Sequence, residues 1–272
     1  MELRLLRFTK VDSPLMAYAK NITSQCGEDG IIERIIELIQ PAHKFCVEFG
    51  AWDGKLYSNC RQLLMHREWN GVMIEANEKK YRELVNTFSG NDRVKTVNRF
   101  VDFEGPNTLD NILAECEAPS DFGLISIDID GNDYHVWKSL ERHSPEIVII
   151  EFNPTVPNDV YFIQDRSFER NQGCSLLALI FLAKERGYEL AACTTVNAIF
   201  VRKEKFGLLQ IRDNSHYSLY QPMQDGRIFS GYDGTIHVVG MDKLFWQGMA
   251  LTQEDFQVLP KSARVYGYAE KK

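Results

Sequence analysis

The chain has no apolar run long enough to cross a bilayer. Its longest, residues 176–183, falls well short of the roughly 20 apolar residues that a membrane-spanning helix needs. The N-terminus also lacks an apolar segment of signal-peptide length. We therefore expect no membrane association and no export, which places the protein in the cytoplasm.

Paired cysteines and excess positive charge are also missing. The 6 cysteines are scattered, with no C-x-x-C pair and no histidine at zinc-finger spacing, so we interpret them as reduced thiols, mostly in the core. Lys and Arg number 31 against 38 Asp and Glu, which gives a net charge of -7. Binding to a polyanion depends on clustered cations, so we expect no nucleic-acid partner.

The 272 residues, 44% hydrophobic and 25% charged, suit one large α/β domain with a small appendage. Helical and strand periodicities alternate from residue 27 to about 202, as in a parallel sheet with crossover helices. The last two predicted strands, 189–194 and 198–202, are too close in sequence for a crossover helix and should pair as an antiparallel hairpin. We therefore predict a Rossmann-like, mostly parallel sheet with an antiparallel seventh strand.

Three parts follow from this pattern. Residues 1–43 are predicted to form an N-terminal helical cap, 44–205 the ligand-binding core, and 206–272 a small β-containing appendage. Inside the core the expected strands are 45–49, 72–75, 94–101, 124–129 and 147–152. The expected helices are 30–39, 56–67, 79–88, 108–115, 134–142 and 175–186. The long polar loop 153–172 is expected to be functional or mobile.

A glycine motif follows the first predicted strand. Glu48, Gly50 and Gly54 form E-x-G-x-x-x-G, whereas a dinucleotide site would show G-x-G-x-x-G. The second predicted strand ends at Glu75, and an acid at that position can accept hydrogen bonds from both hydroxyls of a ribose. Together these features predict a nucleoside-binding site.

Carboxylates follow almost every predicted strand, at the edge of the sheet where open α/β folds bind ligands. These polar residues are Glu48, Asp53, Glu75, Asp102, Asp128, Asp130, Glu151 and Asn153. Acids gathered in one place repel one another unless a positive charge lies between them. A sulfonium ligand or a divalent cation would supply that charge.

The fourth and fifth predicted strands present the densest set. Oxygens of Asp130, Glu151 and Asn153 form a candidate site for Mg²⁺ or Mn²⁺. The alternative, which the sequence leaves open, is that these residues cap helices and turns. His135 is a candidate general base, and its alternative is a solvent-facing position at the start of a helix.

These segments resemble class I S-adenosylmethionine (SAM) methyltransferases, in particular the FkbM-type branch associated with polysaccharide and capsule gene clusters. The resemblance covers residues 24–205. The stretches that carry it are 24–30, 47–54, 72–75, 127–137, 151–154 and 171–173. At 128–131 the chain reads Asp-Ile-Asp-Gly where that branch usually has Asp-Val-Glu-Gly, and the shorter acid is more similar to metal-assisted O-methyltransferases.

The resemblance implies a role for each matching residue. Glu48, Gly50, Asp53 and Gly54 would shape the methionine and ribose end of a SAM pocket. Ser58 or Asn59 would lie near the cofactor carboxylate, and Glu75 would hold the ribose hydroxyls. Val101 and Asp102 would lie at the adenine. Asp128 would face the methionine portion near the reactive sulfonium.

The expected function is that of a SAM-dependent O-methyltransferase with a small, sugar-like acceptor, in which Asp130, His135 and Asp128 take part in catalysis. A sugar hydroxyl is a poor acid, so a bound cation that lowers its pKa would help. Two alternatives remain open: an NAD- or nucleotide-dependent Rossmann enzyme and a non-catalytic SAM-binding module. The sequence leaves the oligomeric state open.

Overall fold

The computed structural model describes residues 13–220, 227–240, 243–244 and 249–263. The chain divides into two compact units, one within residues 1–221 and the other within 222–272. This division lies after two short helices that the sequence-based boundary at 206 assigns to the appendage. Within the described ranges, no helix is long and apolar enough to cross a membrane.

The first unit is built from seven strands and the helices that connect them. The strands are β1 (Phe45–Phe49), β2 (Asn70–Glu75), β3 (Val94–Asn98), β4 (Leu124–Ile127), β5 (Ile147–Glu151), β6 (Tyr188–Cys193) and β7 (Asn197–Arg202). The helices are α1 (Glu28–Ile39), α2 (Arg61–His66), α3 (Glu78–Thr87), α4 (Leu109–Glu115), α5 (Asp133–Ser139), α6 (Leu176–Glu185), α7 (Lys203–Phe206) and α8 (His216–Leu219). Two short 3-10 turns complete it, η1 (Pro14–Tyr18) and η2 (Gly207–Leu209).

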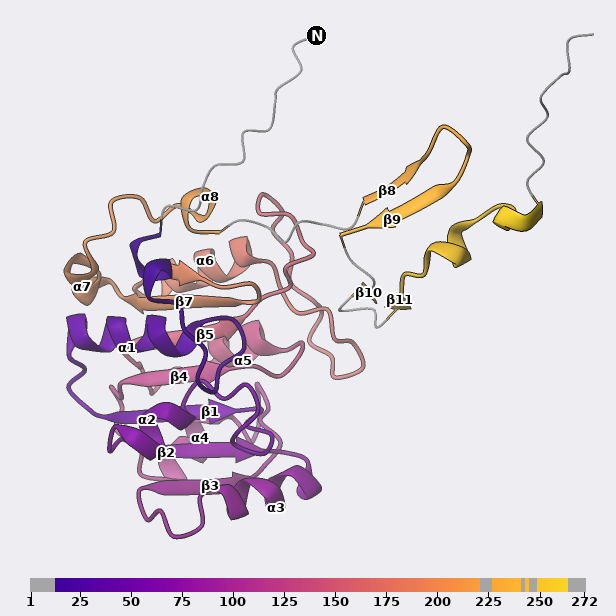
Figure 1. Ribbon diagram of the computed structural model, residues 1–272. Helices are drawn as coiled ribbons and strands as arrows, with labels where there is room; N and C mark the ends of the chain where they lie inside the picture. Colours follow the sequence, from indigo (N-terminus) through magenta and orange to yellow (C-terminus); the bar gives the residue numbers. More distant parts are fainter. Residues whose placement is uncertain (1–12, 221–226, 241–242, 245–248, 264–272) are drawn as a thin grey trace, which may run out of the picture. The chain divides into compact units, whose positions relative to one another are not determined.

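The strands form one sheet in the order β3-β2-β1-β4-β5-β7-β6 (Figure 1). Strands β1 to β5 pair in parallel, while β7 is antiparallel to both β5 and β6. The predicted Rossmann-like class, including the antiparallel strand between the fifth and sixth, is confirmed. The hairpin forms because the short turn between Cys193 and Asn197 leaves no room for a crossover helix.

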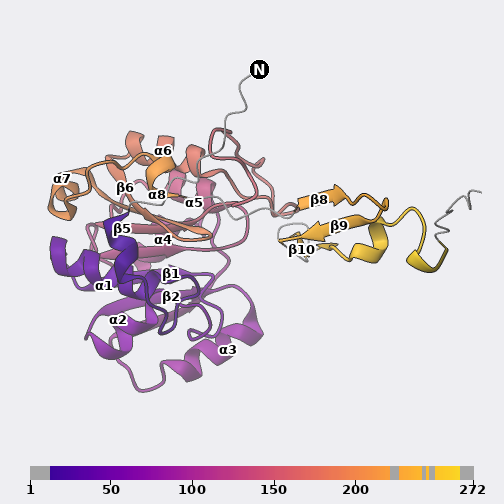
Figure 2. The ribbon, with the colours of Figure 1, turned by 45° about the horizontal axis from the view of Figure 1, so that its top comes forward.

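Helices cover both faces of the sheet (Figures 1 and 2). Side chains alternate along each strand, so β1 sends Val47 and Phe49 to one face and Cys46 to the other. Helices α4, α5 and α6 pack on the first face, where Trp137 is fully buried. Helices α1, α2 and α3 pack on the second. Burial on both faces explains why these strands are almost continuously apolar.

The largest difference from the predicted elements lies after β1. The predicted helix 56–67 begins only at Arg61. Asp53 Oδ1 accepts hydrogen bonds from the backbone N–H groups of Lys55 and Leu56, both at 2.8 Å, and Tyr57 has a φ of 58°. These turns hold residues 50–60 as a loop at the carboxyl edge of the sheet.

Two buried acids attach the N-terminal segment to the sheet. Asp29 Oδ2 accepts hydrogen bonds from the backbone N–H groups of residues 22, 23 and 24 at 2.6 to 2.8 Å. Glu28 is fully buried, and its Oε1 accepts from Thr194 Oγ1 at 2.6 Å and Asn197 Nδ2 at 3.0 Å. The start of α1 is therefore bonded to the turn between β6 and β7.

The second unit is small and consists of short strands and turns. Its elements are β8 (Arg227–Ser230), β9 (Ile236–Val239), β10 (Lys243–Leu244), β11 (Met249–Ala250), η3 (Gln253–Phe256) and η4 (Lys261–Ala263). Strands β8 and β9 form an antiparallel hairpin, as do β10 and β11. At the turn of the first hairpin, the N–H of Gly231 donates to Thr235 O at 2.7 Å.

Candidate functional site

Polar residues gather where β2, β1, β4 and β5 end side by side. Gly50 joins two of these strand ends. It has a φ of 72°, and a Cβ added there would lie 1.9 Å from the backbone oxygen of Asp128. Only glycine lets the loop after β1 lie directly against the end of β4. The close approach that this glycine permits is therefore to another strand of the same sheet.

Gly54 has a comparable role on the other side of the loop. Its φ is 70°, and an added Cβ would lie 2.6 Å from Phe88 and 2.7 Å from Leu84. Leu84 belongs to α3, and Phe88 directly follows it. Together, Gly50 and Gly54 fix the loop between the end of β4 and the helix that follows β2.

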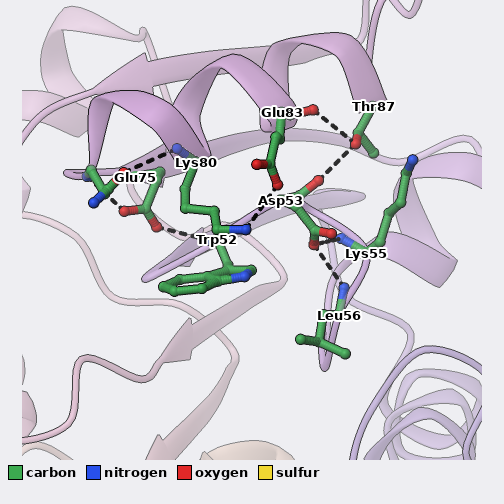
Figure 3. A network of polar contacts seen from close by, with 9 residues as sticks. Trp52, Asp53, Lys55, Leu56, Glu75, Lys80, Glu83 and Thr87 are labelled. Atoms are coloured by element: carbon green, nitrogen blue, oxygen red, sulfur yellow. Dashed lines mark hydrogen bonds and ion pairs between the residues drawn. The ribbon is translucent and has the colours of Figure 1, made fainter.

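Glu75 ends β2 and binds the glycine loop directly (Figure 3). Its Oε2 accepts a hydrogen bond from the backbone N–H of Trp52 at 2.8 Å, and its Oε1 accepts from that of Asn77 at 2.7 Å. Each carboxylate oxygen can accept a second bond, so the group still has acceptor capacity for two hydroxyls. Above it, Lys80 Nζ lies 4.6 Å from the centre of the Trp52 ring, which is 46% exposed.

Glu48 lies beneath the loop and supports it. It is buried, and it accepts hydrogen bonds from Ser58 Oγ at 2.5 Å and from the backbone N–H of Asn59 at 2.8 Å. Asn59 Nδ2 donates in turn to Ser126 Oγ at 3.0 Å. Burial raises the pKa of Glu48 to about 7, although the two bonds from the loop oppose the shift. Glu48, Ser58 and Asn59 thus form one internal network under the loop.

This pKa gives a prediction for stability. A carboxyl with a folded pKa of about 7 and an ordinary value of 4.5 stabilises the fold fully below pH 4.5, and this contribution is lost as the pH rises to about 7. Glu48→Gln keeps the neutral shape and removes the titration. We expect its stability relative to wild type to rise by roughly 3 kcal/mol between pH 4.5 and 7.

Urea unfolding at several pH values measures this difference. The matched control is Glu104→Gln, which makes the same change at an exposed glutamate and should show a much smaller change with pH, because no burial is involved. A Glu48→Gln difference that is equally flat would show that folding does not raise the pKa of Glu48.

Three other predicted cofactor residues take part in local structure, two through hydrogen bonds and one through core packing. Asp53 caps the turn described above, and its carbonyl oxygen accepts from Thr87 Oγ1 at 2.7 Å (Figure 3). Val101 is 6% exposed and packs in the core under α4. Asp102 Oδ1 accepts from the backbone N–H of Phe103 at 2.7 Å. All three lie at the carboxyl edge, and their contact with a cofactor stays a prediction.

Three carboxylates converge at the ends of β4 and β5. Oxygens of Asp128, Asp130 and Glu151 lie within 4.8 Å of one another. Burial, followed by the charges of Asp133 and Asp130, raises the pKa of Asp128 to about 8. Burial and the charge of Asp128 raise the pKa of Glu151 well above its ordinary value. Within the described ranges, none of the three carboxylates forms an ion pair. The group therefore favours a positive ligand.

Asp133 shapes the backbone that carries this acidic group. Its Oδ1 accepts a hydrogen bond from Ile129 N and its Oδ2 from Gly131 N, both at 2.9 Å. Between them, Asp130 has a left-handed φ of 56°. Non-glycine residues in this region are uncommon and cluster at functional sites. This turn exposes the Asp130 side chain.

Asn153, which the sequence places in the metal set, has its side-chain atoms bonded within the loop after β5. Its Oδ1 accepts from the backbone N–H of Thr155 at 2.9 Å and from Thr155 Oγ1 at 2.6 Å. Its Nδ2 donates to Gln172 O at 2.8 Å. The side chain is thus used to fold the loop after β5, and its contact with a metal stays a prediction.

His135 lies inside α5 and is 8% exposed, so it does not face solvent. Its Nε2 lies 2.8 Å from the backbone oxygen of Gln164, in the loop after β5. Its Nδ1 is buried and has no hydrogen-bond partner. Burial lowers its pKa, so the ring is neutral at physiological pH.

Sequence reasoning missed an aromatic cluster beside these residues. Phe168, from the loop after β5, makes an edge contact with Phe100 at 4.6 Å and stacks on Phe103 at 5.3 Å. Phe103 in turn lies 5.8 Å from the His135 ring. The sequence signal that could have revealed Phe168 is a single aromatic residue within the otherwise polar run 164–172. Its two partners, Phe100 and Phe103, come from the segment after β3. Local sequence patterns do not reveal this pairing, because it is a tertiary contact.

No protein-family model and no curated protein sequence matches the chain. Similar solved structures include the N-terminal domain of EvdMO1 with SAH bound, at 14% identity and a TM-score of 0.44, covering 64% of this chain and 80% of that one. A SAM-dependent methyltransferase from Aquifex aeolicus has 10% identity and a TM-score of 0.37, covering 62% and 87%. An O-methyltransferase family protein from Burkholderia thailandensis has 13% identity and a TM-score of 0.41, covering 63% and 55%. Identities this low transfer no substrate and no site residue.

Proposed function

We propose that this protein is a SAM-dependent methyltransferase that methylates a hydroxyl oxygen of a small polar acceptor, of which a sugar or nucleotide sugar is the best candidate. The observation that carries the proposal is the position of Glu75. Its two oxygens are held by the backbone of Trp52 and Asn77, on a strand beside the glycine loop. A ribose placed over this carboxylate would direct the rest of a nucleoside along the carboxyl edge of the sheet.

The acidic group at Asp128, Asp130 and Glu151 supplies the second half of the proposed site. A sulfonium carries a positive charge, which three neighbouring carboxylates attract. Methyl transfer breaks the bond between the sulfur and the methyl carbon and forms a bond from that carbon to the acceptor oxygen. The acceptor proton passes to a carboxylate, for which exposed Asp130 is best placed, and the products are a methyl ether and S-adenosylhomocysteine (SAH).

Alignment accounts for much of the rate in this proposal. Holding two reactants in a productive geometry contributes about 7 to 11 kcal/mol in favourable cases. A carboxylate with a raised pKa is also a stronger base than an ordinary one, since efficient proton acceptors have pKa values near the working pH. The raised pKa values of Asp128 and Glu151 therefore make these two carboxylates, beside exposed Asp130, further candidates for accepting the hydroxyl proton.

The same carboxylates fit a divalent cation. They offer only hard oxygen donors, and Glu151 Oε2 is buried without a hydrogen-bond partner. We propose Asp130 and Glu151, with Asp128, as the residues that would hold Mg²⁺ or Mn²⁺. Such a cation would supply positive charge that lowers the pKa of an acceptor hydroxyl.

Manganese binding tests the metal proposal without an acceptor. We expect wild-type protein to bind about one Mn²⁺ per chain in calorimetry, since the three carboxylates form a single site. Glu151→Gln should weaken binding at least about tenfold, because it removes a charged ligand. Glu104→Gln, which changes an exposed acid elsewhere, should leave binding unchanged. Equal affinity in the two variants, or turnover that a chelator leaves untouched, would remove the metal from the proposal.

Cofactor choice tests the proposed function itself. SAH should give a saturable heat in calorimetry and raise the thermal midpoint, whereas NAD should do neither. A mass-spectrometric screen with SAM and a panel of nucleotide sugars and free hexoses should then show a product about 14 daltons heavier. Stabilisation by NAD alone would favour the oxidoreductase alternative, and SAH binding without any methylated product would favour a binding module.

A further inference from the structure

Buried Gln164 makes several of the hydrogen bonds that fix the loop between β5 and α6. Gln164 is 3% exposed, and its Oε1 accepts hydrogen bonds from the backbone N–H groups of Gln172 at 2.7 Å and Gly173 at 2.8 Å. Its Nε2 donates to Asn132 Oδ1 at 3.2 Å. Its own backbone N–H donates to Gly173 O at 3.0 Å. Gln164 therefore closes the loop on itself and attaches it to the residue before α5.

The base of the loop has a second set of bonds. Phe162 and Ser175 are joined twice, through Ser175 N to Phe162 O at 2.9 Å and Phe162 N to Ser175 Oγ at 3.0 Å. Ile163 and Cys174 form an isolated antiparallel bridge. An added Cβ on Gly131 would lie 3.3 Å from Arg170 O, so the loop lies directly on the turn beside Asp130. In Figure 1 this loop is the long pink segment between β5 and α6.

His135 provides another attachment, and its hydrogen bond determines what the ring can do. A carbonyl oxygen only accepts, so Nε2 must carry the proton that it donates to Gln164 O. The unprotonated nitrogen is then Nδ1, which is buried and out of reach of an acceptor molecule. The charged groups around the ring are Arg166 and Asp165 from the loop and Lys138 from its own helix. This geometry suits a residue that holds the loop and does not suit a general base.

Two half-exposed rings meet at the fixed loop, Phe168 from the loop itself and Phe100 from the segment after β3. Phe168 is 45% exposed and Phe100 is 49% exposed, and they contact each other. Phe103 stacks beneath Phe168, and Arg166 lies 5.3 Å from its centre. Aromatic rings left half-exposed on a rigid support offer a flat apolar surface. The loop that carries Phe168 also lies against Gly131, the neighbour of Asp130, whose carboxylate can bind a hydroxyl.

We infer that loop 161–174 is a preformed wall of the acceptor site, held by His135 and Gln164 as positioning residues, and that Phe100 and Phe168 stack against the apolar face of a ring in the acceptor. This inference rests on the proposed function. The inference narrows the proposed acceptor to a molecule with a ring that has a flat apolar face and hydroxyl groups at its edge. A hexose and a catechol both have such a ring.

Limited proteolysis with trypsin tests the positioning role without activity. Arg166 and Arg170 are exposed in the loop and are potential cleavage sites. We expect wild type and His135→Gln to resist cleavage there, because glutamine can still donate to Gln164 O. His135→Ala should be cleaved at least tenfold faster at these two positions. Equal resistance in wild type and His135→Ala would overturn the positioning role, whether or not the protein binds SAH.

Kinetics with hexoses, nucleotide sugars and catechol as probes test the wall. Phe168→Ala should raise the acceptor KM at least tenfold and leave the SAH Kd unchanged, while Tyr217→Ala, at an exposed aromatic on α8, should change neither.

His135→Gln should keep the wild-type kcat and pH profile. A weaker SAH Kd with unchanged acceptor KM in Phe168→Ala would overturn the wall as an acceptor surface. Loss of kcat and of one limb of the pH profile in His135→Gln would make His135 the base. Which probe gains the methyl group distinguishes a sugar from an aromatic ring.

Discussion

Glu75→Ala is expected to weaken SAH binding about 100-fold or more. Hydrogen bonds to a charged group contribute about 1.5 to 3 kcal/mol each, and the proposed ribose makes two. The substitution also frees the backbone N–H groups of Trp52 and Asn77, and the first of these bonds helps to hold the glycine loop against β2. Calorimetry with SAH measures the affinity directly.

Two variants separate the ribose contact from the support of the loop. Glu75→Gln keeps an acceptor for one backbone N–H but loses the charge, so its affinity should fall between those of wild type and Glu75→Ala. Glu78→Ala removes an exposed acid nearby, on α3, and should bind SAH normally. If Glu75→Ala folds and binds SAH as wild type does, the cofactor assignment fails.

Gly50→Ala is expected to destabilise the protein by about 4 kcal/mol or more, which is a large part of the total stability of a typical domain. Two effects combine at this position. An alanine with positive φ is strained by about 1 to 2 kcal/mol. Its Cβ would also lie 1.9 Å from Asp128 O, so the ends of β1 and β4 would have to separate. Urea unfolding followed by circular dichroism measures the loss.

Gly90→Ala is the matched control for Gly50→Ala. Gly90 has a φ of 79°, and nothing lies within 4 Å of its added Cβ, so only the backbone strain should appear. The difference between the two variants isolates the contact between the strand ends. Equal losses would show that the approach of Gly50 to Asp128 does not constrain the fold.

The sheet was predictable because its strands carry their own signals. Apolar runs ending in acids marked β1, β2, β4 and β5, and the short spacing from Cys193 to Asn197 marked the hairpin. The start of α2 was not predictable in this way. Residues 56–60 have helical periodicity, but hydrogen bonds to Asp53 and Glu48 hold them in a loop. Those bonds join residues that local patterns treat separately.

At the site, the sequence identified which oxygens lie at the carboxyl edge but not which of them meet. Asp130 and Glu151 were predicted together and are together. Asn153 was grouped with them on its position along the strand, yet the turn after β5 directs its side chain to Thr155 and Gln172. Side-chain direction in a loop depends on backbone turns, and periodicity contains no information about them.

Strand β7, which lies between β5 and β6, has a consequence for the synthesis of the chain. During synthesis, β5 and then β6 emerge from the ribosome before residues 197–202, which form β7. Until then β5 is an open edge that can pair with another nascent chain. The hydrogen bonds of buried Glu28, at the start of α1, also cannot form until Thr194 and Asn197 have been synthesised, more than 160 residues later. The bonds that attach the start of α1 to the sheet therefore form only after β7 has been synthesised. A chain truncated before residue 202 should aggregate, because it lacks these bonds and leaves the edge of β5 unpaired.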